Sequence, residues 1–266
     1  MDLLQIRKRQ QETWATGDFA KIGAEQTIVG ELLCEAVPVH AGDRVLDIAT
    51  GAGNTALAAA RRRCTVTGVD FVPALLERGR QRAVAEGLEI DFREGDAMEL
   101  PFPDRSFDVI LSTFGVMFAP DPRVAVAEMV RVCRPGGRIA MANWTPQGLI
   151  GKLFLLTARF APPPPGVAAP VLWGDEAAVR ERLEPHSEEI RVQRQMARFR
   201  ALSPGQWVTH MRTHFGPAIR AFASLPESGQ QSLAAEMEDL VRENNHARNQ
   251  TVLAEGEYLE IVATLS

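Results

Sequence analysis

The stretch that decides the fold is VLDIATGAGNTALAAARRR, residues 45–63. It begins as an apolar run that contains one acid, Asp47, and it ends as an alanine-rich segment typical of a helix. The turn between the two parts contains Gly51 and Gly53, and glycine lets a backbone approach a ligand closely. A strand, a glycine turn and a helix N-terminus in this order favour a site for a small ligand. Glycines that serve only the geometry of the turn are the alternative interpretation.

Predicted strands and helices alternate from residue 44 to residue 143. The strands are 44–49, 64–69, 88–93, a buried strand within FDVILSTFGVMF (107–118), and 138–143. The helices between them are 55–63, 73–86 and 121–133, and the RPGG segment at 134–137 ends the last of these. This alternation implies parallel strands that are joined by right-handed crossovers.

Less regular segments flank this alternating core, which we place at residues 38–144. Residues 1–37 are predicted to form a helical cap with a break at Gly17–Asp18. Residues 145–250 are mainly helical and are expected to form a lid or substrate region, with one core strand near 188–200. Residues 251–266 alternate well enough to form a final core strand.

The composition is that of an ordinary globular protein. A chain of 266 residues has room for one α/β domain with a cap. Its formal net charge of −5 gives no basic surplus, so we expect no nucleic-acid partner. No apolar run has the length of a membrane span, and the N-terminal MDLLQIRKRQQ lacks the apolar core of a signal peptide. We therefore expect a cytoplasmic protein. The three cysteines are expected to be small buried hydrophobes, and the oligomeric state stays open.

Three acids follow three successive strands. Asp47 lies at the end of the first strand, Asp70 ends the second, and Asp96 follows the third. Because the carboxyl ends of parallel strands meet at one edge, we expect the three carboxylates to surround one crevice. A carboxylate at Asp70 can accept hydrogen bonds from ribose hydroxyls, although it can also cap the helix that begins near Pro73. Asp96 can accept from an exocyclic amine, or it is only a turn residue.

A nicotinamide dinucleotide fits this pattern poorly. The GxGxxG pattern fails, because Ala56 stands at the third glycine position. Asp47 also places a carboxylate just before the turn, where a pyrophosphate would be repelled, and a buried carboxylate is costly unless it is paired. A ligand that carries an ammonium and a sulfonium suits this acid better. A nicotinamide dehydrogenase is therefore the weaker interpretation.

The chain resembles the class I S-adenosylmethionine-dependent methyltransferases, particularly the branch with the ubiquinone/menaquinone-biosynthesis enzymes. The resemblance covers residues 45–143 and is carried by VLDIATGAGN, VTGVDF, EGDAMELPFPDRSFDVI and RVCRPGGRIAMANW. It implies an α/β, Rossmann-like, doubly wound sheet, mostly parallel with an antiparallel last strand, plus a helical lid. It also implies S-adenosyl-L-methionine as cofactor, S-adenosyl-L-homocysteine as product and a small-molecule acceptor. One departure is Ala49, where the family often has glycine.

The resemblance further implies a set of cofactor-binding residues at or after the ends of the first four strands: Asp47, Ala49, Thr50, Gly51, Gly53, Asp70, Phe71, Asp96, Ala97, Thr113 and Phe114. Those of the first strand and turn would surround the methionine part. Asp70 would bind the ribose, and Phe71, Asp96 and Ala97 would hold the adenine. Thr113 and Phe114 would offer a carbonyl to the ammonium. Trp14 and Phe19 are candidate lid contacts, although plain packing is favoured for both.

A catalytic base is sought in the lid, because a hydroxyl or protonated amine acceptor must lose a proton. His210 and His214 are spaced to share one helical face and are the candidate bases, with two partly exposed helix histidines as the alternative. The pair resembles half a zinc site, but Met211 stands where the HExxH pattern has glutamate, so no metal is expected. An apolar lid favours an apolar or aromatic acceptor. The competing hypothesis is a non-catalytic, cofactor-binding scaffold.

Overall fold

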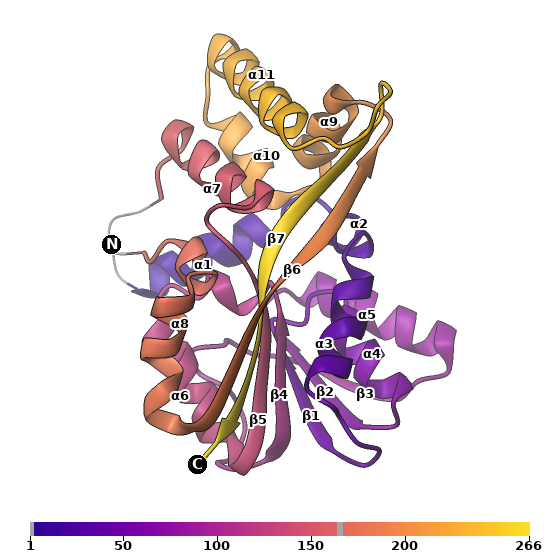
Figure 1. Ribbon diagram of the computed structural model, residues 1–266, viewed down its shortest axis with the longest axis vertical. Helices are drawn as coiled ribbons and strands as arrows, with labels where there is room; N and C mark the ends of the chain where they lie inside the picture. Colours follow the sequence, from indigo (N-terminus) through magenta and orange to yellow (C-terminus); the bar gives the residue numbers. More distant parts are fainter. Residues whose placement is uncertain (1–2, 164–166) are drawn as a thin grey trace.

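A seven-stranded sheet forms the centre of the computed structural model, which describes residues 3–163 and 167–266 (Figure 1). The strand order is β3-β2-β1-β4-β5-β7-β6. The strands are β1 Arg44–Ile48, β2 Thr65–Asp70, β3 Ile90–Glu94, β4 Phe107–Thr113, β5 Cys133–Trp144, β6 Ser187–Ala201 and β7 Val252–Leu265. Strands β1 to β5 pair in parallel, and β7 pairs antiparallel with both β5 and β6. The expected Rossmann-like sheet with an antiparallel last strand is confirmed.

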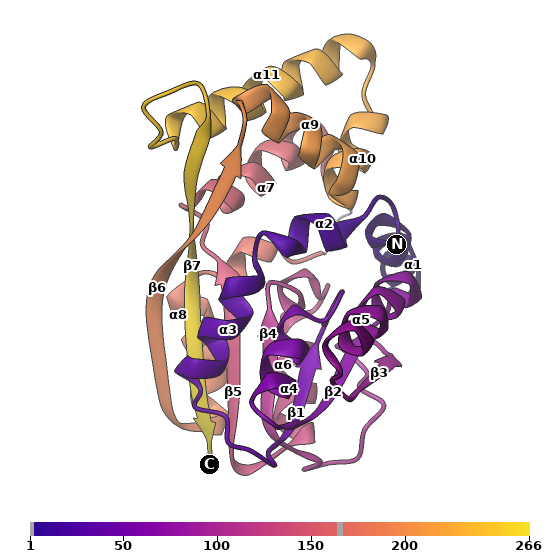
Figure 2. The same ribbon diagram turned by 90° about the vertical axis from the view of Figure 1, so that its right-hand side faces the viewer.

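Helices cover both faces of the sheet (Figures 1 and 2). Helices α3, α4 and α5 lie on one face, and α6 and α8 lie on the other. The helices are α1 Leu3–Trp14, α2 Phe19–Ala24, α3 Thr27–Ala36, α4 Asn54–Arg61, α5 Pro73–Glu86, α6 Pro122–Val132, α7 Leu149–Phe160, α8 Glu176–Leu183, α9 Pro204–His214, α10 Gly216–Ala223 and α11 Glu227–Glu243, with short 3₁₀ turns η1 Val116–Phe118, η2 Pro170–Trp173 and η3 Glu184–His186. No helix of the described residues is long and apolar enough to cross a membrane.

The elements of the core lie close to their predicted positions. Helix α5 begins at Pro73 and ends at Glu86, with Gly87 in the left-handed conformation behind it, as proline and glycine at these places predict. One boundary differs. The segment 134–137 was expected to precede the fifth strand, but β5 already begins at Cys133, which pairs with Phe107 before the register shifts. The glycines of this segment form an irregularity within the strand rather than a separate turn.

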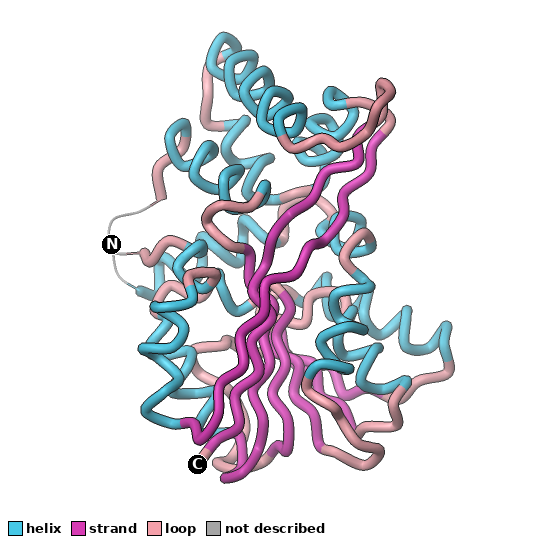
Figure 3. The backbone as a smooth tube through the Cα atoms, viewed as in Figure 1, coloured by secondary structure: helices cyan, strands magenta, loops and turns pink. Residues whose placement is uncertain are grey.

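Strands β6 and β7 form a ribbon that is longer than the rest of the sheet (Figure 3). They pair from Ser187↔Leu265 to Ala201↔Val252, whereas β7 pairs with β5 only along residues 258–264. The outer half of the ribbon therefore projects beyond the carboxyl edge of the sheet, where α7, α9, α10 and α11 gather around it (Figure 1). Within the expected lid region 145–250, α8 lies apart from these helices and contacts α6 and β6 beside the sheet.

Helices α7, α9, α10 and α11 are called the upper helices below. Helices α1 and α2 lie between them and the carboxyl edge of the sheet (Figure 2). Helix α1 contacts α10, and α2 contacts α9 and α5. The chain breaks between α1 and α2 at Gly17, which has a φ of +84°, as the turn signal predicted. Residues 1 and 2 of the expected cap 1–37 lie outside the described residues. The first segment of the chain thus covers the edge where ligands bind in open parallel sheets.

The glycine turn after β1 rests on one aromatic ring. Phe92 of β3 is 6% exposed, and it packs against Gly53, Gly68 and Gly79. A Cβ added at any of the three would lie 2.8–3.0 Å from the ring, which is tighter than nearly all contacts that Cβ atoms make. The three glycines therefore bring the turn, β2 and α5 against a single side chain.

Replacement of Phe92 by alanine should lower the free energy of unfolding by about 3–5 kcal/mol, because the ring fills a space that the surrounding backbone cannot close. Urea unfolding followed by circular dichroism measures this loss. Val84→Ala on α5, where the side chain is 79% exposed, is the control and should change stability by less than about 0.5 kcal/mol. Equal effects of the two substitutions would contradict the packing role of Phe92.

Candidate functional site

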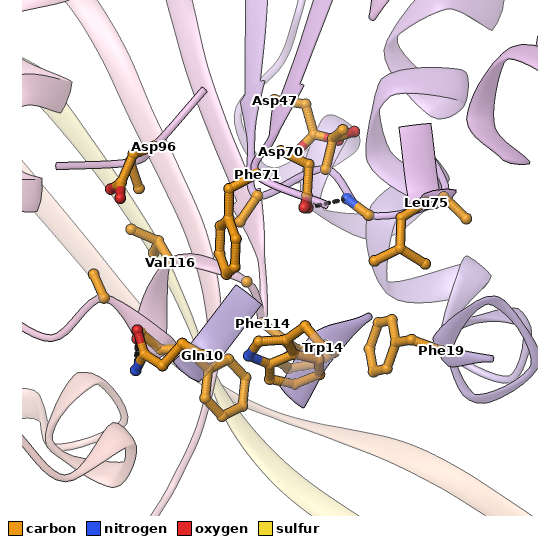
Figure 4. A pocket seen from close by; sticks show the side chains of 18 of the residues that line it. Gln10, Trp14, Phe19, Asp47, Asp70, Phe71, Leu75, Asp96, Phe114 and Val116 are labelled. Atoms are coloured by element: carbon orange, nitrogen blue, oxygen red, sulfur yellow. Dashed lines mark hydrogen bonds between the residues drawn. The ribbon is translucent and has the colours of Figure 1, made fainter. Parts of the chain in front are cut away.

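A cavity of about 380 Å³ lies at the carboxyl ends of β1 to β4, beneath α1 and α2 (Figure 4). This volume is within the usual range for small-molecule sites, about 300–1,000 Å³. The structure brings all but one of the predicted cofactor residues to this cavity: Asp47, Ala49, Thr50, Gly51, Asp70, Phe71, Asp96, Ala97, Thr113 and Phe114. The three acids that follow successive strands therefore do face one crevice.

Asp47 is buried beside the glycine turn. Its Oδ2 accepts hydrogen bonds from the Thr50 hydroxyl at 2.5 Å and from the N–H of Ala56 at 3.0 Å. Burial raises the pKa of Asp47 to about 7, against the lowering effect of these hydrogen bonds, and the nearby Asp70 carboxylate raises it further. The carboxylate thus ties the turn to the first turn of α4 while it also lines the cavity.

Asp70 joins two loops at the end of β2. One carboxylate oxygen accepts from the N–H of Gly51 at 2.9 Å, and the other accepts from the N–H of Val72 at 2.9 Å. The acid was a possible cap for α5, but that helix has Val72 at its N-cap position and no side-chain cap. Burial raises the pKa of Asp70 to about 6. In the described parts of the chain, no arginine or lysine charge acts on the Asp47 or Asp70 carboxylate.

Asp96 is held at the far side of the cavity by the N-terminal helix. Its Oδ2 lies 2.7 Å from Nε of Arg7 on α1, and its Oδ1 accepts from the N–H of Met98 at 2.7 Å. Gln11, one helical turn further along α1, donates a 2.5 Å hydrogen bond to the carbonyl of Phe71. These contacts fasten α1 across the ends of β2 and β3, so that this helix forms one wall of the cavity.

The loops after β1 and β4 meet in a strained contact. Ala49 has a φ of +52° and Phe114 a φ of +61°, and a left-handed backbone costs a residue other than glycine about 1–2 kcal/mol. Gly115, which follows Phe114, allows the two loops to come this close, because a Cβ there would lie 2.5 Å from the Cβ of Ala49. A left-handed backbone favours glycine, so Ala49 holds its conformation at a cost in strain. Strain of this kind collects at functional sites.

Gly53 is the predicted cofactor residue that the structure does not place among the residues lining the cavity. It precedes α4 with a φ of +83°, and its Cα faces the Phe92 ring. Its glycine character therefore follows from backbone conformation and packing. These observations favour the alternative interpretation, glycine for geometry, at Gly53, and its part in cofactor binding stays a prediction.

An aromatic cluster closes the cavity on the side of the upper helices. Trp14, Phe19 and Phe118 line the cavity, with ring centroids of Trp14 at 5.3 Å from Phe19 and at 4.6 Å from Phe118. Phe154 of α7 lies 5.6 Å from Phe118, and Phe215 lies 5.7 Å from Trp14. The sequence left open whether Trp14 and Phe19 are lid contacts or plain packing residues. In the structure the two rings pack together and also face the cavity (Figure 4).

The histidine pair is not part of the cavity wall. His210 and His214 lie on α9 with ring centroids 5.0 Å apart, and neither is among the described residues that line the cavity. Nε2 of His210 lies 3.5 Å from a Glu25 oxygen without forming a hydrogen bond. Burial lowers the pKa of His210, and His214 and Lys21 lower it further. No group of three or more histidine, cysteine, aspartate or glutamate side chains within the described ranges is arranged to hold a metal ion.

Several residues that line the cavity were not found from the sequence: Arg7, Lys8, Gln10, Gln11, Gln26, Asn54, Thr55 and Leu75. Asn54 and Thr55 follow the glycine turn directly, so their position at the start of a helix was a usable signal. The residues of α1 carry no such signal, because nothing local in the sequence indicates which loop a terminal helix will cover.

The fold and the cavity together define a Rossmann-like protein with a ligand site at the carboxyl edge of its sheet. A family model described as a methyltransferase domain matches residues 46–141. An uncharacterized protein of Mycobacterium tuberculosis is 40% identical over 237 residues, which is 87% of this chain and 86% of that protein. The demethylmenaquinone methyltransferase of Deinococcus radiodurans is 37% identical over 186 residues, 65% of this chain and 77% of that enzyme. The chain belongs to the class I methyltransferases of the ubiquinone/menaquinone type.

A solved structure agrees with the fold. The YcgJ protein of Bacillus subtilis superposes with a TM-score of 0.61 at 22% sequence identity, over 88% of this chain and 96% of that protein. The cofactor of this chain is S-adenosyl-L-methionine, the methyl donor of its family. The cavity fits such a group, because two buried carboxylates without a cationic partner face it and a cationic ligand would compensate them.

The raised pKa values predict how stability depends on pH. The folded, ligand-free protein holds protons on Asp47 and Asp70 that the unfolded chain releases above about pH 4, so these two groups contribute less stability as pH rises from 4 through 7. Asp47→Asn removes this contribution and keeps an oxygen for Thr50 and Ala56. Between pH 4.5 and pH 8, the free energy of unfolding of this variant should rise relative to that of wild type by on the order of 2–4 kcal/mol, at about 1.4 kcal/mol for each pKa unit.

Urea unfolding of both proteins at several pH values measures this difference. A constant difference across the range would contradict a buried, uncompensated charge at residue 47. Global unfolding of the asparagine variant at every pH would mean that the turn needs the carboxyl group of Asp47 itself.

Proposed function

We propose that this chain transfers a methyl group from S-adenosyl-L-methionine in line onto a small, apolar or aromatic acceptor and releases S-adenosyl-L-homocysteine. One observation supports the proposal most strongly: Asp47, Asp70 and Asp96 line the same cavity, beside the strained turn. The methyltransferase family of the chain agrees with it. Acids of this kind can bind the hydroxyls, amines and positive charges of the donor.

The donor-binding residues follow from their order along the sheet. Asp70 keeps lone pairs for the ribose hydroxyls after it has accepted from Gly51 and Val72. Phe71 and Ala97 contact the adenine on the side of β3, next to Asp96. On the other side, the residues of the β1 turn and the β4 loop surround the methionine part: Asp47, Ala49, Thr50, Gly51, Thr113 and Phe114.

The protein's contribution to the reaction is alignment and the exclusion of water. When bound, the cofactor would supply a sulfonium methyl, whose bonding electrons would stay on sulfur as the acceptor takes the methyl group and its proton is released to solvent. The carbonyl side of the Thr113–Phe114 loop and the rings of Trp14 and Phe118 enclose the space in front of the donor. His210 and His214 lie outside the cavity wall, and the role of base for either stays a prediction.

The aromatic cluster supports an apolar acceptor. Trp14, Phe19 and Phe118 face the cavity, and Phe154 and Phe215 extend the apolar surface toward α7 and α10. One relative is named for demethylmenaquinone, which agrees with an acceptor of this type. The net charge of −5 argues against nucleic acid as acceptor, and the cytoplasmic location stays a prediction.

Asp70→Ala should weaken binding of S-adenosylhomocysteine by about 1–3 kcal/mol, because charge-assisted hydrogen bonds to the ribose are lost. Isothermal titration calorimetry measures the change. Asp91→Ala on the exposed side of β3, where the side chain pairs only with Arg93, is the matched control and should leave affinity unaltered. Unchanged affinity of the Asp70 variant would remove this residue from the binding site.

Turnover is tested by incubation with S-adenosylmethionine and a panel of quinols, phenols and amines, with S-adenosylhomocysteine measured by mass spectrometry. We expect product with at least one quinol or phenol. Tight donor binding without product across the whole panel would favour a non-catalytic scaffold over an enzyme.

Phe118→Ala should raise the KM for the acceptor about tenfold, because it opens the apolar wall between Trp14 and Phe154. The dissociation constant for S-adenosylhomocysteine should stay within about twofold, since donor contacts lie on the sheet side. Phe160→Ala at the end of α7 is the control for loss of an aromatic ring outside the cavity wall. An equal rise in KM for both variants would argue against an acceptor site at the cluster.

A further inference from the structure

Gln26 lines the cavity, yet its side chain has no hydrogen-bond partner. The residue lies between α2 and α3 and is 6% exposed. Its Nε2 and its Oε1 are both buried, and both lack a partner in the described structure. Buried amide groups in folded proteins are nearly always hydrogen-bonded, and exceptions call for a missing partner. A ligand in the cavity is the partner that the position of Gln26 allows.

The backbone around Gln26 is fixed against the start of α4. The carbonyl of Gly23 accepts from Nδ2 of Asn54 at 2.7 Å and from the N–H of Gln26 at 2.9 Å. One turn later, a Cβ at Gly30 would lie 3.0 Å from Oγ1 of Thr55. Gln26 therefore stands opposite the first turn of α4, where that helix begins without a side-chain cap.

This position is at one end of the cavity. The strand order places Asp96, after β3, and Thr113, after β4, on opposite sides of the β1 turn. Oγ1 of Thr55 donates to Oγ1 of Thr113 at 2.7 Å, so the start of α4 belongs to the β4 side. If Asp70 binds the ribose and the adenine lies toward Asp96, the amino-acid end of the cofactor points toward α4.

The amino-acid end carries an ammonium and a carboxylate, and the carboxylate needs donors. The acids that face the cavity repel it, and the guanidinium of Arg7 is engaged with Asp96 on the adenine side. Donors on the α4 side are the N–H groups of Asn54 and Thr55, since that of Ala56 donates to Asp47, and Nε2 of Gln26. A carboxamide is suited to this end, because it offers a donor to the carboxylate and an acceptor to the ammonium.

We infer that Gln26 binds the zwitterionic amino-acid end of the cofactor through its carboxamide and so fixes the position of the donor sulfur. This inference rests on the proposed function. It gives α2 and α3 a role in binding the cofactor, and it makes Gln26 selective for ligands that retain the amino-acid group over truncated nucleosides.

The test compares two ligands by isothermal titration calorimetry. S-adenosylhomocysteine has the amino-acid end, and 5′-methylthioadenosine lacks it. Gln26→Leu should weaken S-adenosylhomocysteine about tenfold or more and leave 5′-methylthioadenosine within about twofold. Gln26→Glu, which keeps the shape but places a negative charge against the carboxylate, should weaken S-adenosylhomocysteine further than Gln26→Leu, and it serves as the second variant if the leucine protein does not fold.

Gln11→Leu is the matched control, because Gln11 also lines the cavity but donates to the Phe71 carbonyl on the nucleoside side. It should affect both ligands alike. An equal loss for both ligands in the Gln26 variants, or no loss for either, would overturn the role of Gln26 while donor binding itself stands. A wild-type protein that binds neither ligand would overturn the proposed function as well.

Discussion

The site depends on two buried carboxylates that are held by backbone N–H groups instead of by cations. Asp47 accepts from the N–H of Ala56 and so holds the first turn of α4. Asp70 accepts from the N–H groups of Gly51 and Val72 and so holds the loops that follow β1 and β2. The backbone hydrogen bonds orient the acids but leave much of their charge uncompensated. The protein thus stores an electrostatic cost at the place where a cationic ligand would relieve it.

Much of the fold could be predicted because its signals are local. Pro73 and Gly87 delimit α5, the apolar runs delimit the strands, and the alternation of both implies a parallel sheet. The sequence places segment 134–137 before the fifth strand, because glycine and proline rarely continue a strand. The pairing of Cys133 with Phe107 extends β5 through this segment, and that pairing is not visible in the sequence. The placement of α8 beside α6 depends on tertiary contacts that leave no local signal.

The candidate site was predictable where the topology brings residues together and less so elsewhere. Asp47, Asp70 and Asp96 meet because parallel strands end at one edge. The contact of Asp96 with Arg7 joins residues 89 positions apart in the sequence, and no local pattern in either segment indicates it. His210 and His214 are spaced to share one helical face, but this spacing does not say which way the face points, and the structure leaves both outside the cavity wall. Their role as catalytic base stays a prediction. Gln26 resembled an ordinary residue at a helix start.

The long β6–β7 ribbon separates two tasks within one chain. Its inner half completes the sheet through β5, and its outer half supports α9 and α11 without touching the strands that carry the acids. The register of β1 to β4 therefore does not depend on pairing with the outer half of the ribbon. An engineer who wished to vary this chain would change α11 and the ribbon tip first, because α9 and α10 also contact α2 and α1, which cover the donor half.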